Sequence, residues 1–166
     1  MDIKDNNDCC CGKIHHSGFK LSKDDNGYYS FIARKKFDSG MTGEISFDLY
    51  QMSEGSHDVL VDISFVVYRK RKSAWGVPNE ITGRDGAATL VWANEQINAF
   101  SEFVWNKTIA NEVTLVIGWT DKKRGDLYKK VLTQRGFSIV RDEGEIVLKK
   151  KIHRIPLKDR KYQFSR

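Results

Sequence analysis

The segment that decides the fold is a glycine-containing turn that leads into a long helix, and it reads Ile81-Thr82-Gly83-Arg84-Asp85-Gly86-Ala87-Ala88-Thr89-Leu90-Val91. Small residues at such a turn let backbone N–H groups approach a ligand closely, and the start of the helix adds a partial positive charge. The segment therefore predicts an anion-binding turn. Its alternative is a tight turn whose alanines serve close helix packing.

Downstream of this turn, the spacing of apolar residues predicts a helix and then a buried strand. Leu90, Ile97 and Val104 recur at heptad-like spacing, which predicts a helix over about residues 85–109 with a wide apolar face. The run at 113–119 is almost continuously apolar. Such a run is typical of a strand that is buried on both faces, as parallel strands are in α/β layers.

A second helix and a hairpin complete this half of the chain. The helix is expected over about residues 121–135, and Gly136 is expected to end it because glycine accepts the left-handed conformation found there. Residues 137–140 and 145–151 are expected to pair across the turn Asp142-Glu143-Gly144.

The upstream half shows the period of two that is typical of β-strands. Residues 28–35, 44–51 and 58–69 alternate apolar and polar side chains and are separated by turn residues. They predict three antiparallel neighbours in a meander. With the downstream half, they predict a single α+β domain.

The order of these elements resembles that of the GNAT acetyltransferases. Residues 86–91 resemble the pyrophosphate loop of that family, and Gln134-Arg135-Gly136-Phe137 resembles its late Lys-x-Gly-Phe signature. The resemblance covers about half of the chain. It implies a GNAT-like mixed sheet with an N-terminal antiparallel meander, two main helices and a C-terminal hairpin.

The resemblance also implies a site for acetyl-CoA. The pyrophosphate would lie on the turn, and the pantetheine arm would lie between the strand that ends near Tyr68 and the strand at 113–118. The implied cofactor-binding residues are Gly83, Arg84, Gly86, Ala87, Ala88, Leu115 and Ile117.

The implied catalytic residues depart from the pattern of the family. Its general acid is a tyrosine four residues before the glycine of Gly-Phe, and Leu132 stands at that position here. Tyr128 lies one helical turn earlier on the same face and is the candidate replacement. Glu80 and Asp85 are candidates for a general base that deprotonates an acceptor amine through water, although both also suit a role in capping or flanking the helix.

Two functions are compatible with these residues. The first is an acetyl-CoA-dependent N-acetyltransferase that transfers directly to an amine. The chain also resembles small GNAT-like proteins of tailed bacteriophages. That resemblance implies the second function, a non-catalytic protein that binds nucleic acid, a virion component or a host factor.

The positive charge of the chain gathers near its end. The net charge is +6, and residues 149–166 hold eight basic residues and one acidic residue. Such runs attract nucleic acid or acidic protein surfaces, or they remain solvated. The candidate contacts to a partner are Lys149, Lys150, Lys151, Arg154, Lys158, Arg160 and Lys161.

The remaining features bound the domain and its surroundings. We expect a flexible leader over 1–18, one domain over 19–152 and a basic tail over 153–166. Cys9, Cys10 and Cys11 lack the Cys-x-x-Cys spacing of a zinc site, so no metal is expected. No apolar run reaches the roughly 18 residues that span a bilayer, and residues 1–8 do not form a secretory signal. A cytoplasmic location, or one in the virion, is expected.

Overall fold

The computed structural model describes residues 18–23, 29–51, 58–68, 86–106, 110–119 and 122–153. Within these residues the chain forms seven strands and two α-helices, with a 3-10 turn after each helix. The elements are β1 (Lys20–Lys23), β2 (Tyr29–Lys36), β3 (Thr42–Gln51), β4 (Val59–Tyr68), α1 (Gly86–Phe103), η1 (Val104–Asn106), β5 (Glu112–Ile117), α2 (Lys122–Leu132), η2 (Thr133–Arg135), β6 (Ser138–Asp142) and β7 (Glu145–His153). The predicted α+β class is confirmed.

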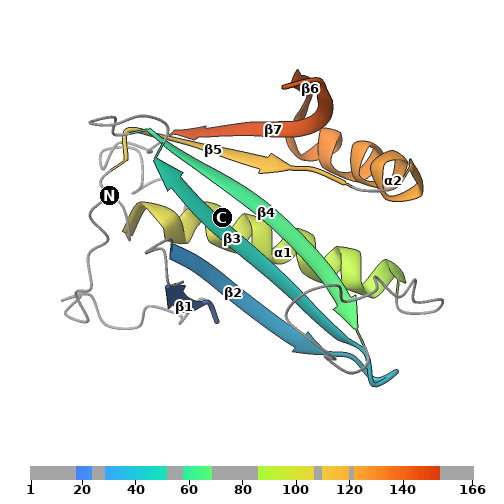
Figure 1. Cartoon of the computed structure of the whole chain (residues 1–166). Coiled ribbons are helices and arrows are strands. Elements are labelled where there is room, and N and C mark those ends of the chain that lie inside the picture. The colour runs from blue at the N-terminus through green and yellow to red at the C-terminus, as the bar shows by residue number, and fades with distance from the viewer. Residues whose placement is uncertain are drawn as a thin grey trace, which may run out of the picture.

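The strands form one mixed sheet in the order β1-β2-β3-β4-β5-β7-β6. Neighbouring strands are antiparallel except for β4 and β5, which are parallel. Helix α1 lies between these two strands in the chain and passes behind β3 and β4 in the view of Figure 1. No helix among the residues described is long and apolar enough to cross a membrane.

Buried and half-buried side chains alternate along the strands, so the two faces of the sheet differ in burial. On β3, Ile45, Phe47 and Leu49 are buried, whereas Ser46 and Asp48 between them are half-buried and point to the other face. The buried side chains pack against α1, where the ring of Phe100 stacks on that of Phe47 with centroids 4.0 Å apart. The core therefore lies between α1 and the sheet, and the opposite face of the meander carries mainly polar side chains.

The structure corrects two expectations about the elements. The meander has four strands rather than three, because the short strand β1 pairs with β2. Phe19, next to β1, packs against the rings of Phe47, Phe100 and Phe103. The first helix ends at Phe103 rather than near residue 109, and a 3-10 turn follows it. That tighter turn allows Val104 and Trp105, which are adjacent in sequence, both to be buried.

The end of the second helix matches the expectation. Gly136 has a φ of 85° after η2, and the N–H of Phe137 donates to the carbonyl oxygen of Leu132 at 3.1 Å. These features stop the helix and turn the chain into the β6–β7 hairpin, which is paired as expected. Strand β5 is buried on both faces, also as expected, since all residues from Val113 to Ile117 are buried.

Candidate functional site

The two parallel strands in the middle of the sheet separate along their length. Strands β4 and β5 pair from Val59 opposite Val113 as far as Asp62 opposite Val116. Strand β4 then continues to Tyr68, whereas β5 ends at Ile117. Figure 1 shows the two strands spreading apart toward their carboxyl ends. The sheet therefore has an opening between β4 and β5, which are both interior strands of the sheet.

A cavity of about 350 Å³ lies at this opening. Its volume falls in the range of about 300–1,000 Å³ that is typical of small-molecule sites. Its walls come from β3, β4, α1, the end of β5, α2 and the start of β7. The lining residues are Ile45, Asp62, Ile63, Ser64, Phe65, Leu90, Ala93, Asn94, Ile97, Ile117, Gly118, Trp119, Arg124, Tyr128, Val131, Leu132 and Glu145.

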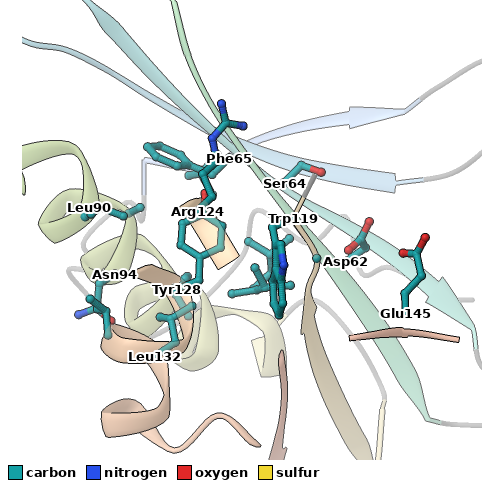
Figure 2. A pocket seen from close by; sticks show the side chains of 17 residues that line it. Asp62, Ser64, Phe65, Leu90, Asn94, Trp119, Arg124, Tyr128, Leu132 and Glu145 are labelled. Atoms are coloured by element: carbon teal, nitrogen blue, oxygen red, sulfur yellow. The ribbon is translucent and has the colours of Figure 1, made fainter. Parts of the chain in front are cut away.

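The cavity joins the two faces of the sheet. Ile63 and Phe65 of β4 point to the face that carries α1, and Asp62 and Ser64, which alternate with them, point to the other face. In Figure 2, Asp62 and Glu145 lie on one side of Trp119, and the side chains from the helices lie on the other. The cavity thus has an apolar part between the helices and an acidic part on the opposite face.

In the acidic part of the cavity, the surroundings of Asp62 raise the pKa of its carboxyl group. Burial raises the pKa of Asp62, and the charge of Asp48 directly across the β3–β4 pair raises it further, against a lowering by a backbone hydrogen bond at Ile63. Asp48 accepts hydrogen bonds from the hydroxyls of Ser30 at 2.5 Å and Ser46 at 3.4 Å. Asp62 therefore holds a proton more readily than an ordinary aspartate does, which suits a group that accepts one.

Replacing Asp62 with asparagine should change how stability depends on pH. The folded pKa of Asp62 lies above the ordinary value of 3.8, so the favourable contribution of the protonated carboxyl is complete below pH 3.8 and is lost as the pH rises through the folded pKa. Asparagine stays neutral. The difference in unfolding free energy between Asp62→Asn and the parent should shift in favour of the variant between pH 3 and pH 7. Urea unfolding at both pH values measures it, and a difference that does not change with pH would contradict the assignment.

Helix α2 closes the apolar part of the cavity with one of its faces. Arg124, Tyr128 and Leu132 recur every four residues and therefore lie on the same side of α2, and all three line the cavity. Trp119, just after β5, packs on the backbone of Gly125, and the ammonium of Lys129 lies 5.1 Å from the centroid of its ring. The indole is thus held between the end of β5 and α2, at the edge of the cavity.

Of the three predicted catalytic residues, the structure describes only Tyr128. Tyr128 is half-buried and lines the cavity, so it contacts the same space as the residues of β4 and α1. Leu132 also lines the cavity and belongs to the hydrophobic core at 6% exposure. The candidate bases Glu80 and Asp85 lie outside the residues described.

Of the seven predicted coenzyme-binding residues, the structure describes five. Gly86 is the first residue of α1, and Ala87 and Ala88 are exposed in the first turn of that helix. Ile117 lines the cavity, whereas Leu115 is fully buried in the core and is not among the lining residues. Gly83 and Arg84 lie outside the residues described.

Six lining residues with polar side-chain groups were not predicted from the sequence as part of this site, namely Asp62, Ser64, Asn94, Trp119, Arg124 and Glu145. Asp62 belongs to the polar face of an ordinary alternating strand, and its position at the strand separation depends on the fold. The sequence did carry a signal for Asn94, because it is the amide in the otherwise apolar stripe of Leu90 and Ile97. Its Oδ1 atom is buried and has no hydrogen-bond partner.

The three lysines expected to contact a partner each contact the protein itself. Lys149 pairs with Asp142 and Lys151 with Glu112, both at 2.8 Å. Lys150 donates to the carbonyl oxygen of Arg135 at 2.9 Å. Arg154, Lys158, Arg160 and Lys161 lie outside the residues described, as do Cys9, Cys10 and Cys11 and residues 1–17 of the expected leader. No group of three or more metal-binding side chains occurs in the described part of the chain.

Comparison of the chain with protein-family models, with curated proteins and with solved structures found no match.

Proposed function

We propose that this protein is a GNAT-like N-acetyltransferase that uses acetyl-CoA and transfers the acetyl group directly to an amine. The observation that carries the proposal is the cavity at the separation of β4 and β5, between α1 and α2. The GNAT resemblance implies that the pantetheine arm enters the sheet between these two strands. The cavity lies at the place where the sequence resemblance would put the coenzyme.

The residues around the cavity fit such a ligand. The pairing of β4 with β5 stops at Asp62, so the backbone of Ile63, Ser64 and Phe65, which line the cavity, can meet the amides of a pantetheine arm. Gly86 begins α1, and the start of a helix of this length favours a pyrophosphate group.

Each residue then has a chemical role in the transfer. Acetyl-CoA supplies the activated thioester when it is bound. Asp62 accepts the proton of the acceptor amine, for which its raised pKa is suited. Tyr128 carries a hydroxyl into the cavity wall and is the proton donor to the thiolate. Leu132 and Trp119 exclude water around them, which strengthens the effect of these polar groups.

A non-catalytic GNAT-like protein is the second candidate function. The observation that favours it is Leu132, which stands at the general-acid position implied by the resemblance and packs in the core. In this case the cavity binds no acyl donor, and the basic residues of the chain contact nucleic acid, a virion component or a host factor.

Calorimetric titration with acetyl-CoA tests the first function against the second. We expect micromolar binding to the parent protein. Gly86→Glu should weaken it by at least about tenfold, because a carboxylate at the start of α1 repels a pyrophosphate. The same substitution complements the helix dipole and should leave the fold intact.

A charge-matched control separates repulsion of the pyrophosphate at the start of α1 from the effect of a more negative net charge on the whole protein. Asn98→Glu adds the same charge to an exposed position of α1, about 18 Å along the helix from Gly86. It should bind acetyl-CoA as the parent does. If the parent shows no heat and no thermal stabilisation at millimolar acetyl-CoA, the enzymatic proposal fails and the non-catalytic function remains.

A further inference from the structure

Two pairs of like charges border the acidic part of the cavity. Asp48 lies directly opposite Asp62 in the β3–β4 pair, and Asp142 lies directly opposite Glu145 in the β6–β7 pair. Asp62 and Glu145 both line the cavity. Like charges at directly opposite positions of a sheet repel each other and destabilise it. The protein therefore bears an electrostatic cost at two places around one cavity, and a cation in the cavity reduces it.

The protein itself compensates these charges only in part. Lys149 pairs with Asp142 at 2.8 Å, but no ion pair within the described residues includes Asp62 or Glu145. Burial and the charge of Asp48 both raise the pKa of Asp62, as expected for a carboxylate without a nearby cation. Both lining carboxylates are thus available to a positively charged ligand.

The basic residue that lines the cavity lies away from these carboxylates. In Figure 2, Arg124 is on the side of Trp119 that carries the side chains of the helices, and Asp62 and Glu145 are on the other side. Glu145 is exposed and Asp62 is half-buried, so solvent and a ligand can reach both. The field in this part of the cavity therefore attracts cations.

The separation of the two carboxylates selects the shape of the ligand. Asp62 lies opposite Val116, and Val116 lies opposite Lys149, which follows Glu145 by four residues on β7. Two strand spacings and the rise over these residues place the backbones of Asp62 and Glu145 on the order of 15 Å apart. A compact cation reaches one carboxylate only, whereas an elongated ligand with a charge at each end reaches both.

We propose that the acidic part of the cavity binds a linear aliphatic diamine or polyamine, with one ammonium group at Asp62 and a second at Glu145. The methylene chain between the two groups matches a cavity that is acidic at two separate points. A monoamine of the same length has only one of the two contacts. Glu145 is then the residue that distinguishes a diamine from a monoamine.

The role of this ligand as acetyl acceptor rests on the proposed function, whereas its binding does not. In that role, the ammonium at Asp62 loses one proton to that carboxylate, which releases it to solvent. The nitrogen forms the C–N bond as the C–S bond of the thioester breaks. Its second proton replaces the one that Tyr128 gives to the sulfur. Glu145 holds the distant ammonium in place during the transfer.

The test compares 1,8-diaminooctane with 8-amino-1-octanol by calorimetry at low salt. The two compounds have the same length, and the second carries a hydroxyl in place of one ammonium group. The parent protein should bind the diamine at least about threefold more tightly, which is the size expected for one exposed ion pair. Glu145→Gln should remove this preference and leave the affinity for the amino alcohol unchanged.

A matched variant controls for the net charge of the protein. Glu143→Gln removes the same charge at an exposed residue of the same turn that does not line the cavity. It should keep the preference of the parent for the diamine. Equal affinity of the parent for the two compounds would overturn the proposal, and so would an equal loss of preference in Glu143→Gln and Glu145→Gln.

The proposed function fails or stands separately. If the parent binds acetyl-CoA but does not prefer the diamine, the proposed function stands and this inference falls. If the parent prefers the diamine through Glu145 but does not bind acetyl-CoA, the cation site stands and its role as an acceptor site falls.

Discussion

Phe100→Ala should lower the unfolding free energy by about 3–5 kcal/mol, the largest effect on stability that we expect from a single substitution. Phe100 is fully buried and lies at the centre of a group of aromatic rings. It stacks on Phe47 of β3 and meets the rings of Phe19, Phe31 and Phe103 at centroid distances between 5.6 and 6.1 Å. Truncation leaves a cavity that joins α1, β2 and β3, and small domains have only about 5–15 kcal/mol in total.

Urea unfolding followed by circular dichroism measures this loss. Val91→Ala on the same helix is the control, because Val91 is 60% exposed and its truncation should change stability by less than about 0.5 kcal/mol. A loss below about 1 kcal/mol for Phe100→Ala would mean that α1 does not pack on the sheet as described. The cavity would then not exist as described, because α1 and β4 form two of its walls.

Gly125→Ala should destabilise the protein by about 1–3 kcal/mol, although alanine is the better helix former. A Cβ atom at position 125 would lie 2.6 Å from Cδ1 of Trp119 and closer still to its Nε1 atom. The indole would have to leave the first turns of α2, and with it would go the contact with Lys129. Because Trp119 lines the cavity, its indole N–H signal in an NMR spectrum should also move toward that of a solvated indole.

The sign of this effect is the informative quantity. Helix propensity alone predicts that Gly125→Ala stabilises the protein by up to about 1 kcal/mol. Gly118→Ala is the control, because a Cβ atom there meets nothing within 4 Å and therefore does not displace Trp119. A more stable Gly125→Ala variant with an unchanged indole N–H signal of Trp119 would show that Trp119 does not pack on α2.

Much of the fold followed from local patterns in the sequence. The apolar run of β5 and the glycine that ends η2 are signals that depend on neighbouring residues only, and both were interpreted correctly. Strand β1 was missed because Lys20–Lys23 is short and polar. What holds it is the packing of Phe19 on rings that are 28 to 84 positions away in the chain. The first helix was predicted too long because periodicity does not distinguish an α-helix from a 3-10 turn at its end.

The candidate site followed from the sequence only in part. Tyr128 and Ile117 were predicted, since the resemblance places them beside the coenzyme cleft, and both line the cavity. Asp62 was missed because its place depends on where β4 and β5 stop pairing, and no local pattern encodes that point. Asn94 was missed because a helix asparagine is usually a surface residue, and only the packing of α1 on the sheet buries its oxygen.

An NMR titration of the labelled protein with acetyl-CoA shows whether the coenzyme binds in the cavity between β4 and β5. We expect the signals of the Trp119 indole N–H and of the backbone amides of Ser64, Phe65 and Gly118 to shift as acetyl-CoA is added. These residues line the cavity from both sides of the separation between β4 and β5. The amides of Ile139 and Val140 in β6 should stay in place. Shifts confined to the β6–β7 hairpin, or no shifts at all, would contradict the assignment of this cavity to the coenzyme.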